Sequence, residues 1–209
     1  MSFFQNTCKP EGLGGMLMVN MMNNGHAKLA EWGFSHISMP KDAKILDVGC
    51  GGGANITVWL DKCSNGHVTG LDYSDVSVNK SVKVNSKAIQ EKRCEVVQGN
   101  VADMPFKDNS FDCVSAFETI YFWPGLERCF KEVSRVLKPH AKFLVVVESD
   151  GTDRSGEKWA EKIEGMTVYK EEEIIRNLEK SGFEIAEVVH NEKNWMCIVA
   201  DKKVELGRS

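Results

Sequence analysis

The sequence lacks the patterns that mark several classes of protein. Its 209 residues include seven cysteines, an odd number with no C-x-x-C pair, which predicts free thiols in a reducing compartment rather than a disulfide framework. The five histidines are isolated, so no metal-ligand spacing is present and we expect no metal. No run of about 18 apolar residues occurs, and the N-terminus lacks the charged-then-apolar pattern of a signal peptide. These absences favour a cytoplasmic protein without a membrane span.

Charge also excludes some partners. The formal net charge is −4, from 26 Lys and Arg against 30 Asp and Glu, whereas nucleic-acid binding usually needs a basic face. Hydrophobic residues make up 42% of the chain, which suits one α/β domain with a sizeable core. We therefore expect a monomer or homodimer that binds neither nucleic acid nor membrane.

A glycine cluster is the most informative stretch of the chain. The apolar segment Lys44–Val48 runs into the glycines of residues 49–53, and the helix-compatible stretch Ala54–Lys62 follows. Glycines at a strand-to-helix turn let the backbone approach a ligand because no Cβ stands in the way. The pattern predicts a nucleotide-like cofactor site at the carboxyl edge of a parallel sheet.

Two kinds of cofactor are compatible with this glycine turn. Gly49, Gly51 and Ala54 satisfy the dinucleotide pattern G-x-G-x-x-G/A, with Asp72 about 20 residues further on to bind a ribose. Asp47, however, would repel a pyrophosphate, whereas it would attract an amino-acid ammonium directly or through water. The pattern D-x-G-x-G-x-G from Asp47 to Gly53 resembles the first motif of class I S-adenosylmethionine-dependent methyltransferases.

The resemblance continues through the next two segments. His67–Asp72 is typical of a strand that ends in an acid, and the resemblance implies that Asp72 takes the ribose hydroxyls while Tyr73 lies along the adenine. Ser74 suits the N-cap of the next helix. Gly99–Phe106 is similar to the family's G-D-A-x-x-L-P-F segment, with Asn100 in place of an aspartate that commonly contacts the adenine amino group. An asparagine carbonyl can still accept that hydrogen bond.

The rest of the core follows the same family pattern. Phe111–Glu118 is similar to the family's F-D-x-V strand, whose carboxyl end should lie beside the transferable methyl group. Apolar spacing predicts a helix over Leu126–Leu137, and His140-Ala141 replaces two glycines that commonly follow it. Lys142–Glu148 is a near-continuous apolar run, as expected of a strand buried on both faces. The resemblance implies these cofactor-binding residues: Asp47, Gly49, Cys50, Gly51, Asn55, Asp72, Tyr73, Ser74, Asn100, Val101 and Phe117.

These segments predict a fold and a division of the chain. We expect a three-layer αβα Rossmann-like sandwich with a mostly parallel, seven-stranded sheet. Phe183–His190 and Trp195–Ala200 would form its C-terminal antiparallel hairpin. Residues 1–40 are expected to form a helical lid segment, and residues 41–205 the S-adenosylmethionine-binding methyltransferase domain, a single domain overall.

The acceptor side is predicted from position in the resembled fold. The candidate catalytic residues are Glu118, Tyr121 and His26, and the candidate substrate-binding residues add Trp123 and Asn23. Glu118 could act as a general base, bind a cationic substrate, or serve the cofactor or the structure. Tyr121 and Trp123 could form an aromatic wall that favours a cation, or pack in the core. His26 has a pKa suited to neutral pH, although a lone histidine is more often a surface or core residue.

The function that these patterns favour is methyl transfer from S-adenosylmethionine to a small-molecule acceptor by in-line displacement, which yields S-adenosylhomocysteine. The alternatives are a non-catalytic S-adenosylmethionine-binding regulator and a methyltransferase for a protein side chain. An NAD-dependent oxidoreductase is third, because no catalytic Tyr-x-x-x-Lys pair is present. Whether O, N, S or C is methylated stays open.

Overall fold

The computed structural model describes residues 26–152, 158 and 160–204. Its helices are α2 (Ala27–Ser35), α3 (Ala54–Lys62), α4 (Asp75–Val84), α5 (Ser86–Gln90), α6 (Leu126–Val136) and α8 (Glu171–Lys180), with the 3₁₀-helix η2 (Ile120–Phe122). Its strands are β1 (Lys44–Val48), β2 (His67–Asp72), β3 (Cys94–Gln98), β4 (Phe111–Phe117), β5 (Leu137–Val147), β6 (Phe183–His190) and β7 (Met196–Lys202). None of the helices within these ranges is long and apolar enough to cross a membrane.

The seven strands form one sheet in the order β3-β2-β1-β4-β5-β7-β6. The five neighbouring strands β3, β2, β1, β4 and β5 pair in parallel, and β7 runs antiparallel to both β5 and β6. This confirms the predicted α/β sandwich with its C-terminal antiparallel hairpin. The strand order reverses between β1 and β4, and the crevice outside the carboxyl ends of such a pair is where open α/β sheets bind ligands.

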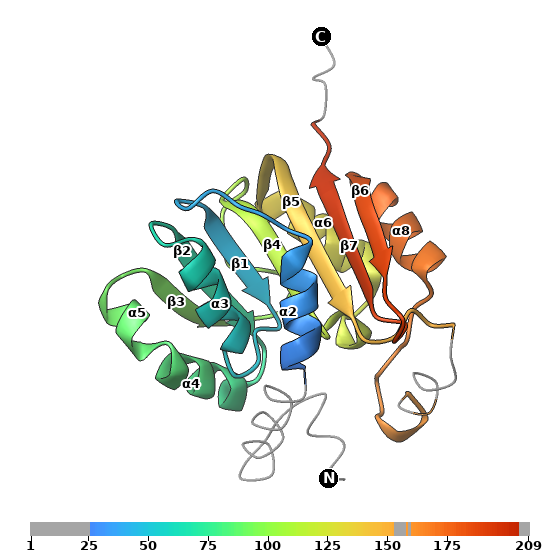
Figure 1. Ribbon diagram of the computed structural model, residues 1–209, viewed down its shortest axis with the longest axis horizontal. Coiled ribbons are helices and arrows are strands. Elements are labelled where there is room, and N and C mark those ends of the chain that lie inside the picture. The colour runs from blue at the N-terminus through green and yellow to red at the C-terminus, as the bar shows by residue number, and fades with distance from the viewer. Residues whose placement is uncertain (1–25, 153–157, 159, 205–209) are drawn as a thin grey trace.

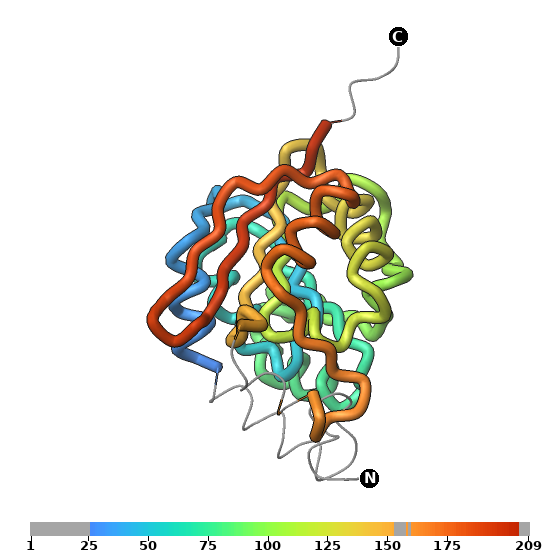
Figure 2. The backbone as a smooth tube through the Cα atoms, turned by 90° about the vertical axis from the view of Figure 1, so that its right-hand side faces the viewer, coloured from blue at the N-terminus to red at the C-terminus, as the bar shows by residue number. Residues whose placement is uncertain are grey.

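Helices cover both faces of the sheet. Figure 1 shows α2 and α3 in front of the sheet and α6 behind it, and Figure 2 shows α2 and α6 on opposite sides. On the front face, the Phe34 ring lies 5.0 Å from Trp59 and 4.7 Å from Phe117. On the back face, Phe130 of α6 packs against Phe143 of β5 at 5.5 Å. Both faces of the central strands are therefore buried, which explains their near-continuous apolar sequences.

Sequence features set where several elements begin. Gly53 precedes α3 in the left-handed region, with φ of 81°. The Ser74 hydroxyl accepts a hydrogen bond from the Ser77 amide and caps α4, as expected. Three glutamates occupy the first turn of α8, where the helix dipole favours negative charge.

Strand β5 begins earlier than the apolar run predicts. It follows α6 directly at Leu137, which pairs with Phe111, and the register then shifts before Lys142 pairs with Cys113. His140, which stands where the family commonly has glycine, has φ of 60°. His140 therefore adopts a left-handed backbone conformation without being glycine, which costs about 1–2 kcal/mol of stability.

The N-terminal segment is described only from residue 26 onward. Helix α2 packs tightly on the sheet, since a Cβ on Gly33 would lie 2.6 Å from a methyl group of Val146. The methionine-rich part of the expected lid, together with Asn23, lies outside the described residues.

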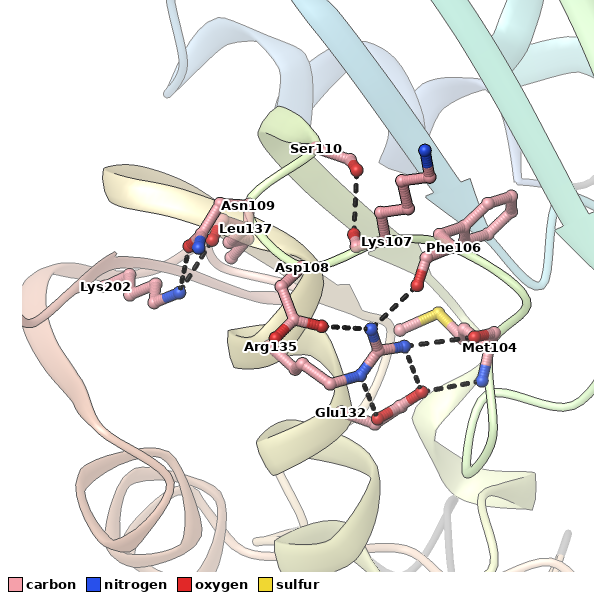
Figure 3. Close-up of polar contacts among 10 residues, drawn as sticks. All are labelled: Met104, Phe106, Lys107, Asp108, Asn109, Ser110, Glu132, Arg135, Leu137 and Lys202. Atoms are coloured by element: carbon pink, nitrogen blue, oxygen red, sulfur yellow. Dashed lines mark hydrogen bonds and ion pairs between the residues drawn. The ribbon is translucent and has the colours of Figure 1, made fainter.

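Arg135 of α6 holds the segment that follows β3 (Figure 3). Its guanidinium donates to the carbonyl oxygens of Met104 at 3.0 Å and Phe106 at 2.7 Å, and to the carboxylate of Asp108 at 2.7 Å. Glu132 pairs with Arg135 at 2.7 Å and accepts the Met104 amide at 2.7 Å. Arg135 and its ion-pair partner Glu132 therefore fix the Met104 amide and the carbonyl groups of Met104 and Phe106.

Candidate functional site

A cavity of about 820 Å³ opens at the carboxyl edge of the sheet. Its walls come from the glycine loop after β1, the ends of β2 and β4, the residues after β3, helix α2 and the segment 122–124. This volume lies toward the upper end of the roughly 300–1,000 Å³ that is usual for small-molecule sites. The cavity therefore stands at the reversal point of strand order, where the sequence predicts the cofactor.

The glycine loop needs its glycines for different reasons. Gly49, Gly51 and Gly53 all have positive φ, at 70°, 52° and 81°. A Cβ on Gly49 would lie 2.1 Å from the Thr119 hydroxyl, whereas a Cβ on Gly51 would have no atom within 4 Å. Gly49 thus allows close internal packing, and Gly51 leaves open space on the cavity wall, where a ligand can approach the backbone.

Asp72 joins the loop to the end of β2. Its Oδ2 accepts the Gly51 amide at 2.9 Å and its Oδ1 accepts the Ser74 amide at 2.9 Å. Burial raises the pKa of Asp72, and these amides act in the opposite direction. Asp72 and Tyr73 line the cavity, so the carboxylate can accept hydrogen bonds from a ribose. Ser74 does not line it and serves as the helix cap.

Asp47 lies behind the loop, in the core rather than on the wall. Its Oδ1 accepts the Ser115 hydroxyl at 2.7 Å, and the Trp59 indole donates to that hydroxyl at 2.9 Å. Its Oδ2 is buried with no hydrogen-bond partner, and burial raises the pKa of Asp47 to about 7. An unpartnered buried carboxylate oxygen invites a donor. The residues present therefore fit a cofactor with an ammonium group better than one with a pyrophosphate.

The remaining expected cofactor residues lie on the wall. These are Cys50, Asn55, Asn100, Val101 and Phe117. The side-chain oxygen Oδ1 of Asn100 already accepts a hydrogen bond from the Ala102 amide at 2.9 Å. Its second lone pair is what an adenine amino group would use, so the predicted contact at Asn100 has to share its acceptor.

Three ionisable side chains meet on the acceptor side. Glu118 follows β4 with φ of 56°, and its Oε1 accepts hydrogen bonds from the Tyr121 hydroxyl, at 3.3 Å, and from the Glu148 amide. Its Oε2 lies 4.0 Å from His26 Nε2, which lies 3.9 Å from Glu148 Oε2. Burial, with the neighbouring Glu148 charge adding to it, raises the pKa of Glu118 to about 8, while burial lowers the pKa of His26.

The two expected aromatic residues occupy different positions. Trp123 lines the cavity, stacks on Phe143 at an interplanar angle of 9° and donates to the Thr119 hydroxyl at 3.2 Å. Tyr121 does not line the cavity, because its hydroxyl is turned toward Glu118 from behind. Any effect of Tyr121 on an acceptor therefore acts through Glu118.

Several wall residues have no distinguishing signal in the sequence. Lys62 and the α2 residues Leu29 and Phe34 line the cavity, but nothing in their spacing separates them from ordinary core residues. Glu148 could have been found: β4 and β5 are adjacent parallel strands, and both runs end in a glutamate. Such ends meet at the same edge of a sheet.

Comparisons with known proteins agree with this geometry. Residues 46–145 match the family model described as "Methyltransferase domain". The "24-methylenesterol C-methyltransferase 2" of Arabidopsis thaliana is 39% identical over 108 residues, which are 52% of this chain and 30% of that protein. The "Sterol 24-C-methyltransferase erg-4" of Neurospora crassa is 36% identical over 53% of this chain and 29% of its own length. The chain thus spans less than a third of these relatives.

A solved structure supports the fold over a larger share of the chain. The crystal structure of a "SAM dependent methyltransferase" from Aquifex aeolicus superposes with a TM-score of 0.75 at 20% identity, and covers 89% of this chain and 97% of its own. At this identity the likeness establishes the fold.

Proposed function

We propose that this chain is a class I, S-adenosylmethionine-dependent methyltransferase that methylates a small-molecule acceptor by in-line displacement. The cofactor supplies an activated sulfonium methyl group, so the protein has to hold and orient the two reactants, exclude water and, where the acceptor requires it, remove a proton. The cavity that spans both the glycine loop and Glu118 is the observation that carries this proposal.

The cofactor half of the site assigns a role to each group. Asp72 is oriented by two amides and accepts the ribose hydroxyls, and Gly51 provides the open backbone beside it. The unpartnered oxygen of Asp47 would attract the cofactor's ammonium from behind the glycine loop, without lining the cavity itself. These roles disfavour NAD, because its pyrophosphate would stand near the buried carboxylate of Asp47.

The acceptor half supports a catalyst rather than a regulator. A non-catalytic binding protein would be favoured if Glu118, Tyr121 and Trp123 filled the core. Tyr121 is buried, yet Glu118 and Trp123 line the cavity. The side chains from α2 in this wall, including Leu29 and Phe34, are mostly apolar. The sterol methyltransferase names of the relatives also favour a small organic acceptor over a protein side chain.

We assign removal of the acceptor's proton to Glu118, on the acceptor side of the cavity. Glu118 reaches the cavity, its raised pKa of about 8 suits a general base near neutral pH, and the Tyr121 hydroxyl fixes the orientation of its carboxylate. His26 lies 4.0 Å away, and burial lowers its pKa, so it stays neutral beside Glu118. We retain the cytoplasm, and a monomer or homodimer, as predictions.

The experiment is a turnover assay with S-adenosylmethionine and a panel of amines, thiols, phenols and apolar alkenes. We expect S-adenosylhomocysteine to form only with some acceptors, together with a product that is one methyl group heavier. The Glu118→Gln variant should lower kcat at least 10-fold and leave S-adenosylhomocysteine binding within about twofold. Tight cofactor binding without any transfer across the panel would favour the regulator.

A further inference from the structure

The cluster of His26, Glu118 and Glu148 has a chemistry that a generic acceptor site does not need. The side chains come from the start of α2, the end of β4 and the residue after β5, and their free atoms all lie within 4.8 Å of one another. His26 and Glu118 line the cavity, and the Glu118 side chain is only 12% exposed. Two carboxylates that converge in this way repel each other unless a cation lies between them.

We propose that this cluster is an ammonium site that binds the amino nitrogen of the methyl acceptor, so that the acceptor class is an amine with an apolar body. This inference rests on the proposed function and deepens it. His26 and Glu148 fall outside residues 46–145, the part that matches the methyltransferase family model. His26 lines the cavity, whereas Glu148 does not line it and approaches the cluster with a side chain that is 57% exposed.

The spacing of the cluster suits an ammonium better than a metal ion. His26 Nε2 lies 4.0 Å from Glu118 Oε2 and 3.9 Å from Glu148 Oε2. A nitrogen that donates hydrogen bonds of about 2.8 Å in tetrahedral directions holds its acceptors about 4.6 Å apart, or about 4.0 Å apart at right angles. Ligands about 2.1 Å from a metal lie only about 3.0–3.4 Å apart. The observed 4.0 and 3.9 Å equal the right-angle separation around a nitrogen and exceed the separation around such a metal.

The other contacts leave three acceptors for such a nitrogen. Glu118 Oε1 is already engaged by the Tyr121 hydroxyl and the Glu148 amide, which leaves Oε2 to face the cluster. Glu148 Oε2 and a neutral His26 Nε2 complete the set. Phe122 and Trp123 line the same cavity, and aromatic faces attract the methylated ammonium that forms.

The transfer step then balances. The lone pair of the neutral amine forms the N–C bond to the methyl group, the C–S bond breaks with its electron pair passing to sulfur, and S-adenosylhomocysteine leaves as a thioether. Before this step the bound ammonium gives one proton to the Glu118 carboxylate, which frees the lone pair, and the product is the N-methylated ammonium. An ammonium could also come from the cofactor itself, but Asp47 already offers that group an acceptor behind the glycine loop.

The test measures binding as well as turnover. The full chain, saturated with S-adenosylhomocysteine, is titrated calorimetrically with a size-graded set of phenylalkylamines and terpenyl amines, each paired with the alcohol of the same carbon skeleton. We expect at least one amine to bind 10-fold or more tightly than its alcohol. Glu148→Gln and His26→Gln should remove that preference, whereas Glu192→Gln, at an exposed position away from the cavity, should retain it.

Each contrary outcome has a distinct meaning. If S-adenosylhomocysteine binds but no amine is preferred over its alcohol, the ammonium site is wrong and the proposed function stands. If Glu148→Gln weakens S-adenosylhomocysteine binding as much as amine binding, the cluster serves the cofactor's own ammonium and the inference fails. Micromolar Mn²⁺ binding that Glu148→Gln abolishes would replace the ammonium site with a metal site. Absence of S-adenosylhomocysteine binding would instead overturn the proposed function.

Discussion

The amide of Gly51 donates to the carboxylate of Asp72 across 21 residues of sequence, at 2.9 Å. The same carboxylate accepts the Ser74 amide that begins the turn into α4. Asp72 therefore fixes the glycine loop relative to the end of β2, and the site is largely shaped by the chain itself.

This relationship predicts two effects of Asp72→Ala. The affinity for S-adenosylhomocysteine should fall at least 10-fold, about 1.4 kcal/mol, because the ribose acceptor is lost. The free energy of unfolding should also fall by about 1–3 kcal/mol, because two amides lose their acceptor. Calorimetry and urea denaturation measure the two effects. Asp75→Ala, at the exposed first residue of α4, should leave the affinity unchanged; equal effects of both variants would contradict this role.

Two glycines should separate binding from stability. In Gly51→Ala the new methyl group meets open space, so the unfolding free energy should fall only by the cost of a left-handed alanine, about 1–2 kcal/mol. Cofactor binding should be lost, because the methyl group projects into the cavity. In Gly53→Ala the methyl group would lie 2.4 Å from Ser81 Oγ and 2.5 Å from Asn85 Nδ2, so the fold itself should be weakened further. Thermal unfolding and titration with S-adenosylhomocysteine distinguish the two; retained binding in Gly51→Ala would place the cofactor elsewhere.

Asp47 should make stability depend on pH. Its pKa is raised to about 7 in the folded protein, against about 3.9 in an unfolded chain. The unfolded state therefore releases the proton first, and this group's contribution lowers stability as pH rises from about 4 to about 7, by up to about 4 kcal/mol. In Asp47→Asn that contribution is gone, so the variant's unfolding free energy should fall less than the parent's between pH 5 and 7.5. Parallel slopes in urea denaturation would show that Asp47 is already ionised in the folded state.

The Arg135 ion pair should stabilise the segment after β3. Arg135→Met leaves the mostly buried Glu132 without its cation, so we expect a loss of about 3 kcal/mol in unfolding free energy. The affinity for S-adenosylhomocysteine should fall by a few fold, because Asn100 and Val101 belong to the same segment. Arg128→Met, at an exposed position on the same helix, should cost less than about 0.5 kcal/mol. The double variant Arg135→Met/Glu132→Gln should recover part of the loss; no recovery would mean that the pair is not coupled.

The cofactor half was predictable because its signals are local. Glycine spacing, the acid at Asp72 and the cap at Ser74 each lie within a few residues of a strand end, and the parallel strands bring those ends together. The bounds of β1, β2 and α3 agree with the sequence prediction for the same reason. The early start of β5 was not predictable, because it depends on Leu137 pairing with Phe111 and on His140 adopting positive φ.

The acceptor half depends on contacts that the sequence does not encode locally. Tyr121 and Trp123 lie in one short segment, yet one faces Glu118 from behind and the other lines the cavity. The 3₁₀-helix η2 and the packing of Trp123 on Phe143 decide this difference. His26 meets Glu148 only because α2 lies against the sheet, a contact that spans most of the described chain.

We propose that the cavity binds S-adenosylmethionine through Gly51 and Asp72, with the Asp47 carboxylate behind the loop. Parallel titration calorimetry of the unmodified chain with S-adenosylmethionine, S-adenosylhomocysteine and NAD tests this binding. We expect micromolar binding of the first two and no binding of NAD. Binding of NAD alone would contradict this proposal and identify the glycine loop as a dinucleotide-binding site.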